Sequence, residues 1–193
     1  MENPGKLIFK ELDDSNLPAL KEFCSSCKRL GYHNNESFQT IKLDKMKMPY
    51  GKFFIGIDSE KIVTLAGVHK LPEVNEHAWR CLFRGAQLPG YTPVWSMNIF
   101  KSCLQFNQLL YQQIKVVQQI DIDAEFYIST NIDSTTGAKS SRMNDKIMPR
   151  IEKQGVCKLY LKNFMLYNVS QNIWKIDVEE YFRQRKQYYP AVS

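Results

Sequence analysis

The stretch RGAQLPGYTPVWSMN, Arg84 to Asn98, stands between an apolar run typical of a strand and a long helical pattern. Within it, Gln87, Gly90 and Thr92 follow a Gln-x-x-Gly-x-Thr spacing. Backbone N–H groups at the start of a helix have no partner inside the helix and attract anions, and a glycine lets a phosphate approach them. Two interpretations are open: a loop that holds a phosphate, or a capped turn from strand to helix.

The residues before this stretch predict an antiparallel meander. GKFFIGID and KIVTLAGVHK are apolar runs separated by a turn at 58–60, which is a hairpin signal. AWRCLFRG follows after a loop and is expected to be the third consecutive strand. Further upstream, KLIFKEL is typical of a first strand, and a helix with Asn16 as its N-cap is expected to follow it. A second, shorter helix is expected in NNESFQTIKLDKM.

The residues after the stretch predict alternating helices and strands. Thr92 and Pro93 form a helix start, and apolar residues at steps of three or four up to Val117 predict one face of a long helix. EFYISTN, residues 125–131, is typical of a buried strand. A helical pattern then runs to Gly155 with Pro149 inside it, where a proline should kink or shorten the helix.

The C-terminal part predicts strands in VCKLYL, NFMLYN and NIWKID and a short helix in EEYFRQRK. The element order indicates an α/β fold with a mixed, mainly antiparallel central sheet flanked by helices. We expect a single domain over residues 1–193, with a basic C-terminal extension from about residue 171.

This element order resembles the GNAT superfamily of acyl-CoA-dependent N-acyltransferases, over about residues 6–167. The family carries Gln/Arg-x-x-Gly-x-Gly/Ala in the quoted loop, and this chain differs only in having Thr92 at the small last position. A second family pattern is Asn-x-x-Ala-x-x-x-Tyr-x-x-x-Gly-Phe. Asn144 and Gly155 match it, and the three other places hold Ile147, Ile151 and Val156.

The resemblance implies acetyl-CoA or another acyl-CoA as co-substrate. The pyrophosphate would meet backbone donors of Gln87, Leu88, Gly90, Tyr91 and Thr92. The acyl-pantetheine arm would lie between two splayed strands, AWRCLFRG and EFYISTN, and face the backbone of Leu82, Phe83 and Arg84. Asn144 would hydrogen-bond near the pantetheine, although an ordinary polar residue in a first helical turn is the alternative.

The resemblance also implies direct acyl transfer to a primary amine, with a base that takes the amine proton and an acid that protonates the thiolate. Ile151 stands where the family often has its acidic tyrosine, so Tyr127 or Tyr160 would have to serve, unless each only packs. The candidates for the base lie before the splayed strands: His69, Glu73, Glu76 and His77. Asn131 would contact the arm or the substrate, or else cap the following loop.

Charge and composition bound the partners. The 193 residues include 26 basic and 20 acidic ones, and the net charge of +6 favours anionic partners. FRQRKQ, residues 182–187, is the only dense basic segment. A binding protein of the same fold that has lost transfer, and a basic nucleic-acid or phage-type interaction protein, are the alternatives to an N-acetyltransferase. No recognised nucleic-acid module supports the latter, so we expect no nucleic-acid partner.

The remaining features concern location and cysteines. No apolar run is long enough to span a bilayer, and no secretory leader is expected, so we expect no membrane association. Five cysteines are an odd number and are expected to be reduced thiols in the cytoplasm. Cys24-Ser-Ser-Cys27 lacks a second ligand pair, so core packing is favoured over a metal site. We expect a monomer or homodimer that binds acyl-CoA and an amine, either a small molecule or a protein.

Overall fold

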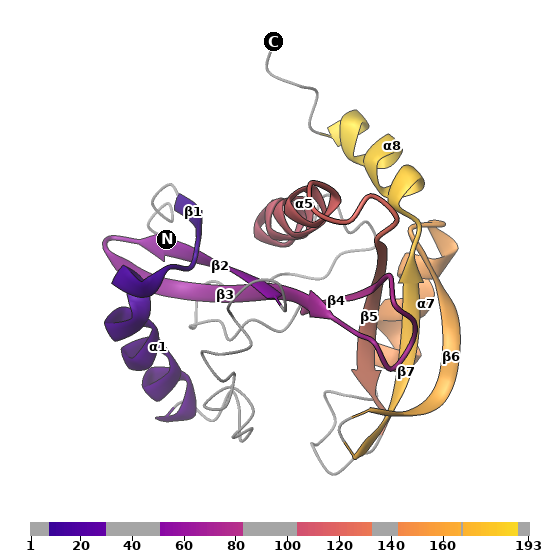
Figure 1. Cartoon of the computed structure of the whole chain (residues 1–193), viewed down its shortest axis with the longest axis horizontal. Coiled ribbons are helices and arrows are strands. Elements are labelled where there is room, and N and C mark those ends of the chain that lie inside the picture. Colours follow the sequence, from indigo (N-terminus) through magenta and orange to yellow (C-terminus); the bar gives the residue numbers. More distant parts are fainter. Residues whose placement is uncertain (1–7, 30–50, 83–103, 133–142, 167, 189–193) are drawn as a thin grey trace.

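A computed structural model describes residues 8–29, 51–82, 104–132, 143–166 and 168–188. These residues form one seven-stranded sheet in the order β1-β2-β3-β4-β5-β7-β6, drawn in Figure 1. The strands are β1 (Ile8–Glu11), β2 (Gly51–Asp58), β3 (Lys61–Lys70), β4 (Ala78–Leu82), β5 (Glu125–Asn131), β6 (Cys157–Leu166) and β7 (Val169–Ile176). All neighbouring strands are antiparallel except β4 and β5, which are parallel. This arrangement confirms the expected mixed, mainly antiparallel sheet.

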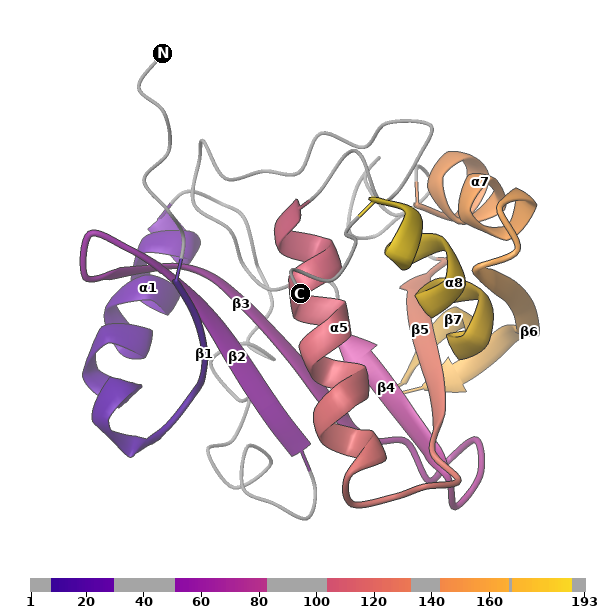
Figure 2. The same cartoon turned by 90° about the horizontal axis from the view of Figure 1, so that it is seen from above.

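Helices cover both faces of the sheet. They are α1 (Leu17–Arg29), α5 (Leu104–Gln118), α7 (Met148–Lys153) and α8 (Val178–Tyr188). In Figure 1, α5 and α8 lie above the sheet and α1 lies below it, and Figure 2 shows α5 running between α1 and α8 when the molecule is seen from above. None of the described helices is long and apolar enough to cross a membrane.

The β2–β3 hairpin matches its sequence prediction at both ends. Its two turn residues, Ser59 and Glu60, have φ angles of 48° and 69°, which suit the tight turn of a two-residue hairpin. The side chains of this hairpin alternate between the faces. Phe53 and Ile55 pack against Phe23 of α1, whereas Phe54 faces the side of α5. The hairpin therefore anchors one helix layer on each face.

Helix α1 begins differently from the prediction. A short 3-10 turn, η1 (Asp14–Asn16), precedes it, and Asp13 caps that turn by accepting a hydrogen bond from the N–H of Ser15 at 2.9 Å. The predicted cap Asn16 is thus the last residue of η1. The difference arises because aspartate two residues before a serine caps the chain one turn earlier.

Helix α5 supplies the main core on its face of the sheet. Leu110, Ile114 and Val117 are buried in one cluster with Trp79 of β4 and Phe126 of β5. These three helix residues follow the predicted apolar face. The predicted cap at Thr92 and the residues up to 103 lie outside the described residues.

The helix predicted around Met143 to Gly155 is split in two. A π-helical turn, η3 (Met143–Ile147), leads into α7 (Met148–Lys153). Pro149 stands in the first turn of α7, where its missing N–H costs no helical hydrogen bond. Gly155 ends the helix with a φ of +75°, as predicted, because only glycine adopts this angle without strain.

The C-terminal strands form a hairpin. VCKLYL and NFMLYN, predicted as two strands, are one strand, β6. Asn163 has a φ of 55° within it, and the register with β7 shifts on both sides of Leu161. An asparagine that adopts a left-handed conformation explains why the strand pattern looks interrupted. The chain from about residue 171, where we expect an extension, contributes β7 and α8, and β7 lies inside the sheet between β5 and β6.

Candidate functional site

The parallel pair of β4 and β5 is short. Within the described residues the two strands pair at Ala78↔Glu125, Trp79↔Phe126 and Arg80↔Tyr127 and at no further position. Both strands continue, β4 to Leu82 and β5 to Asn131, but in this described part each then pairs with its outer neighbour alone, β3 or β7. Figure 2 shows β4 and β5 starting side by side and then diverging. We call Cys81–Leu82 of β4 and Ile128–Asn131 of β5 the diverging segments.

The diverging segments expose one backbone edge each. Because β3 and β7 occupy the outer edges, the inner N–H and C=O groups have no strand partner within the described residues. Backbone polar groups need hydrogen-bond partners, whether from protein, water or ligand. An extended ligand that carries amide groups can satisfy both edges at once, in the way that a peptide adds to a sheet.

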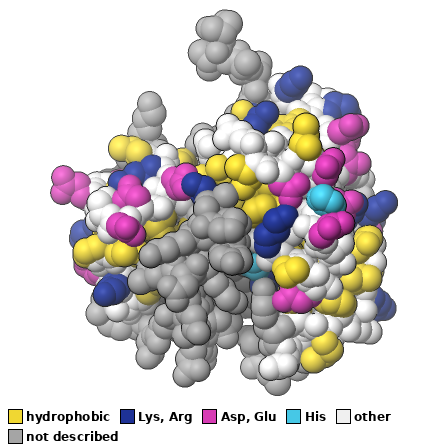
Figure 3. Space-filling view, viewed as in Figure 1, with side chains coloured by type: hydrophobic (Ala, Val, Ile, Leu, Met, Phe, Trp, Pro, Cys, Tyr) yellow, Lys and Arg dark blue, Asp and Glu magenta, His cyan; other side chains and the backbone are white. Residues whose placement is uncertain are grey.

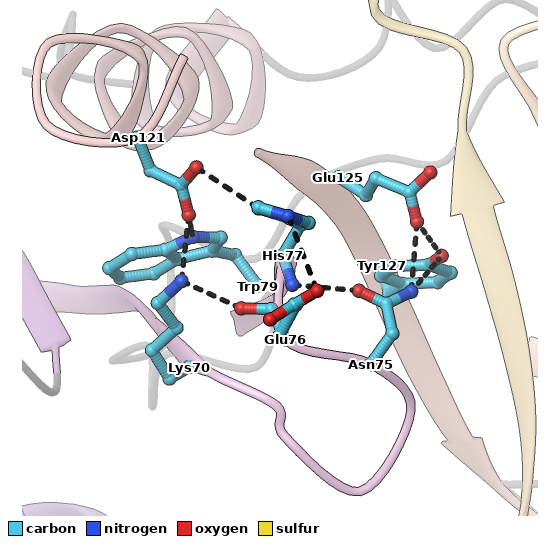
Figure 4. Close-up of polar contacts among 8 residues, drawn as sticks. All are labelled: Lys70, Asn75, Glu76, His77, Trp79, Asp121, Glu125 and Tyr127. Carbon is cyan, nitrogen blue, oxygen red and sulfur yellow. Dashed lines mark hydrogen bonds and ion pairs between the residues drawn. The ribbon is translucent and has the colours of Figure 1, made fainter. Parts of the chain in front are cut away.

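A carboxylate cluster holds the paired end of β4. Asp121 accepts hydrogen bonds from Lys70 Nζ at 2.7 Å and Trp79 Nε1 at 2.8 Å, and His77 Nδ1 lies 3.5 Å from its other oxygen. Burial acts to raise the pKa of Asp121, but the bonds from Lys70 and Trp79 outweigh it and the pKa is lowered. We call this the Asp121 cluster, shown in Figure 4. It ties the end of β3 and the start of β4 to the connection between α5 and β5.

A second cluster holds the start of β5, also shown in part in Figure 4. The Glu125 carboxylate accepts from Lys175 Nζ, from Tyr127 Oη at 2.5 Å and from Asn75 Nδ2 at 2.9 Å. The hydrogen bond from Lys175, followed by that from Tyr127, lowers the pKa of Glu125 to about 2. Burial and the neighbouring Glu125 raise the pKa of Tyr127. In this Glu125 cluster the carboxylate is therefore ionised and the phenol protonated.

A polar network fixes the other end of β5. Thr130 Oγ1 donates to Asn144 Oδ1 at 2.6 Å, and Asn144 Nδ2 donates to the carbonyl oxygen of Asn131 at 2.7 Å. Asn172 Nδ2 also donates to Asn144 Oδ1, at 3.0 Å. Trp174 Nε1 donates to Thr130 Oγ1 at 3.0 Å. We call these residues the Asn144 network; it joins β5, β7 and the turn η3.

Two of the proposed catalytic residues lie near the point of divergence. His69 of β3 stands opposite Arg80, and Arg80 stands opposite Tyr127. Directly opposite residues point to the same face of a sheet, so these three share the face that α1 covers elsewhere. His69 is half-buried, and its Nδ1 lies 2.7 Å from the carbonyl oxygen of Lys70.

The other candidate bases lie at the opposite end of β4. Glu73, Glu76 and His77 belong to the β3–β4 connection, before β4 begins. Glu73 and Glu76 are exposed, and His77 is half-buried. Tyr160 of β6 is exposed, with its ring centroid 5.3 Å from that of Tyr127. His69 and Tyr127 therefore lie at the divergence, whereas the β3–β4 connection lies at the paired end of β4.

Some of the residues expected to contact the cofactor lie among the described residues, and others do not. Leu82 is the last residue of β4, and Asn144 lies in η3. Asn131 is the last residue of β5, half-buried, with its carbonyl bound by Asn144. The remaining expected contacts lie outside the described residues and stay predictions: Phe83, Arg84, Gln87, Leu88, Gly90, Tyr91 and Thr92.

The position of the family's acidic tyrosine is a core position here. Ile151 is buried in the same cluster as Phe126, Trp174 and Tyr181. An isoleucine side chain has no proton to give, so this position cannot supply an acid.

Sequence reasoning missed the charged partners that hold the site. Asp121 and Lys70 are separated by 51 residues, and Glu125 and Lys175 by 50, so no local pattern links them. A signal was present, since Glu125 and Lys175 stand in otherwise apolar or neutral strands. A charge in such a strand requires a partner when the strand is buried.

Several solved structures have a fold similar to that of this chain. An acetyltransferase from Streptococcus agalactiae matches with a TM-score of 0.57 and 11% identity, covering 89% of this chain and 98% of that one. ElaA from Escherichia coli matches with a TM-score of 0.53 and 11% identity, covering 89% and 99%. An acyl-CoA N-acyltransferase from Pseudomonas aeruginosa has the same TM-score and coverages at 8% identity.

No protein-family model and no curated protein sequence matches the chain. At identities near 10%, the likeness to solved structures is one of fold. It extends over most of both chains. The expected fold is confirmed: this chain has the fold of the GNAT acyltransferases.

Proposed function

We propose that the chain binds an acyl-CoA between the diverging segments of β4 and β5 and transfers its acyl group to a primary amine. The observation that carries the proposal is the end of the parallel pair after Arg80 and Tyr127. The pantetheine arm is extended and contains two amides, so it can hydrogen-bond to both inner strand edges. The loop at Gln87, Gly90 and Thr92 would hold the pyrophosphate through backbone N–H groups.

We assign His69 as the base. A carbonyl oxygen only accepts hydrogen bonds, so the 2.7 Å contact of Nδ1 with the Lys70 carbonyl places the proton of the neutral ring on Nδ1. Nε2 is then the basic nitrogen, which takes a proton either from the ammonium before the attack or from the amine as it attacks. Glu73 is the alternative base, in the exposed loop before β4.

We give Tyr127 a supporting role rather than that of the acid. The Tyr127 hydroxyl donates a hydrogen bond to Glu125, the pKa of Tyr127 is raised, and the Tyr127 side chain is buried. The same hydrogen bond joins Tyr127 to the Glu125 cluster at the start of β5. Asn131, at the end of the diverging segment of β5, stays a candidate for contact with the arm or the amine.

A binding protein without transfer is the second candidate. The observation that favours it is Ile151, which packs in the core where the family often has a tyrosine. Both candidates require acyl-CoA binding, and they differ only in whether the thioester is cleaved. A nucleic-acid-binding protein is less well supported. Arg183 donates to Glu180, Arg185 lies 3.9 Å over the ring of Tyr111, and on the face in Figure 3 the described basic and acidic side chains are interspersed.

Location and assembly are part of the proposal. Cys24, Cys81 and Cys157 are free thiols in the structure, as suits a reducing compartment, and we propose the cytoplasm. The acceptor is a primary amine on a small molecule or a protein, and the functional unit is a monomer or homodimer.

Calorimetry with CoA and with acetyl-CoA tests binding. We expect micromolar affinity for both in the native chain, and loss of binding in Gly90→Val, because a branched side chain occupies space that the phosphate needs. Gln87→Ala retains its N–H and serves as the matched control. Absence of heat with both ligands, in a folded sample, refutes the proposal.

Release of free CoA thiol from acetyl-CoA, over a panel of amines, tests transfer. We expect His69→Gln to lower the rate by about 10²- to 10⁴-fold, the usual contribution of a general base, without changing the CoA affinity. If the native chain binds acetyl-CoA but no amine raises thiol release above the background, the binding protein is favoured. An unchanged rate in His69→Gln refutes the assignment of the base.

A further inference from the structure

Among the described residues, strand pairing holds the end of β5 from one side of the sheet only. Its segment Ile128–Asn131 pairs with β7, whereas the ladder to β4 ends at Tyr127. A strand with one open edge depends on its other contacts for its exact position. Those contacts decide where the inner edge of β5 stands relative to β4.

The Asn144 network supplies such contacts, and two of its members are buried. Thr130 and Trp174 are each 3% exposed. Thr130 Oγ1 accepts from Trp174 Nε1 and donates to Asn144 Oδ1, so its one proton and one of its two acceptor lone pairs are used. The chain Trp174–Thr130–Asn144 therefore runs from β7 through β5 to η3 as a directed series of hydrogen bonds.

Asn144 closes this series onto the main chain. Its Nδ2 donates to the carbonyl oxygen of Asn131, the last residue of β5, at 2.7 Å. Its Oδ1 accepts from both Thr130 and Asn172. An amide is needed for this, because the position must accept two hydrogen bonds and donate one. Asn144 also lies in a π-helical turn, an irregularity that often marks functional positions.

We propose that Asn144 is a positioning residue: through Thr130 and the carbonyl of Asn131 it fixes the end of β5, and so the separation of the diverging segments. The second part rests on the proposed function, since the separation matters for an arm that lies between β4 and β5. This role differs from the contact with pantetheine that the resemblance implies for Asn144. The network acts on the ligand through the strand.

The test compares three variants that break the network at different places: Asn144→Ala, Thr130→Val and Trp174→Phe. Thr130→Ser keeps the hydroxyl and is the conservative rescue. Asn75→Ala is the matched control, because it removes an amide that binds Glu125 and Tyr127 at the paired end of β5. Thermal melts establish that each variant is folded.

The first measurement is hydrogen exchange of the backbone amides of residues 128–132 without ligand. The N–H of Ile132 donates to the carbonyl of Ser170, so exchange there reports how well the end of β5 is held. We expect about tenfold faster exchange in the three network variants, an opening free energy lower by about 1.4 kcal/mol. Thr130→Ser and Asn75→Ala should exchange like the native chain. Unchanged exchange in Asn144→Ala and Thr130→Val overturns the inference, whatever the ligand does.

The second measurement is the affinity for CoA and for adenosine 3′,5′-bisphosphate, which lacks the pantetheine arm. We expect the three network variants to bind CoA about tenfold more weakly and the bisphosphate with unchanged affinity. A general loss of stability does not change the ratio of the CoA affinity to the bisphosphate affinity, as long as the sample is folded. Weaker CoA binding in Asn144→Ala alone means that Asn144 contacts the ligand directly, and this overturns the positioning role. A native chain that binds no CoA refutes the proposed function, whereas the exchange result still decides whether Asn144 fixes β5.

Discussion

Replacing Glu125 with glutamine removes one negative charge from a cluster in which three donors converge: Lys175, Tyr127 and Asn75. The pKa of Glu125 is lowered from its ordinary value of 4.5 to about 2. Each tenfold change in proton affinity corresponds to about 1.4 kcal/mol, so the difference corresponds to at most about 3.5 kcal/mol. Glu125 is 33% exposed and Lys175 30%, and solvent therefore screens the pair. We expect Glu125→Gln to lower the free energy of unfolding by about 1–2 kcal/mol at pH 7.

The sign of the pH dependence follows from the lowered pKa. An acid whose pKa is lower in the folded state stabilises that state above its unfolded pKa, and the stabilisation is lost as the pH falls through its folded pKa. For Glu125 the window runs from about 4.5 down to about 2. The difference between the native chain and Glu125→Gln should therefore be constant above pH 5 and fall to roughly half or less at pH 3.

Urea unfolding followed by circular dichroism at pH 7, 5, 4 and 3 measures this difference. Other carboxylates titrate in both proteins, so their contributions cancel when the two free energies of unfolding are subtracted. Asp123→Asn, an exposed carboxylate two residues before Glu125, is the control and should show no difference at any of these pH values. A deficit of Glu125→Gln that is the same at pH 3 as at pH 7 would show that shape, not charge, accounts for it.

Three further outcomes follow from the core and the C-terminal helix. Ile114→Ala leaves a cavity in the fully buried core under α5, and its free energy of unfolding should fall by about 2–5 kcal/mol in urea melts, whereas a loss under 1 kcal/mol contradicts the packing. Gly67→Ala places a Cβ 2.4 Å from the ring of Phe53, so it should cost about 1–3 kcal/mol, and Gly67→Ala with Phe53→Leu should recover part of the loss. We expect the native chain to have no measurable affinity for DNA or RNA at low salt, so neutralising the basic residues of 182–187 should not change nucleic-acid binding. Binding of the native chain that weakens steeply with salt refutes this.

The hairpin of β2 and β3 and the strand β5 could be predicted to the residue. Their apolar runs are bounded by residues that end a strand for local reasons, such as Ser59 and Glu60 in the hairpin turn. The described part of the predicted apolar face of α5 is confirmed for the same reason, because Leu110, Ile114 and Val117 are buried and follow the period of a helix. For these elements, local periodicity and turn chemistry were enough to predict the bounds, and the order of the elements indicates the fold.

Other features depend on partners that are distant in the sequence. The break predicted in β6 is wrong because β7 holds the strand together across Asn163, although its φ is positive. The π-helical turn before α7 is not visible in the pattern of apolar residues, since Ile147 is buried in either kind of helix. The roles of the carboxylates Asp121 and Glu125 could not be predicted, because their donors Lys70 and Lys175 are distant in the sequence and meet them only in the folded chain.

The three residue pairs between β4 and β5 also bear on the order in which the sheet is made. Strands β1 to β4 form a meander in which β2, β3 and β4 follow one another closely along the chain, and β6 and β7 form a hairpin. Contacts between residues that are close in the sequence form early, because closing a short loop costs little entropy. The pairing of β4 with β5 spans the whole of α5 and must close a long loop for the three residue pairs found among the described residues. We therefore expect the two halves of the sheet to fold first and to join late, so that the diverging segments come into being only in the last step of folding.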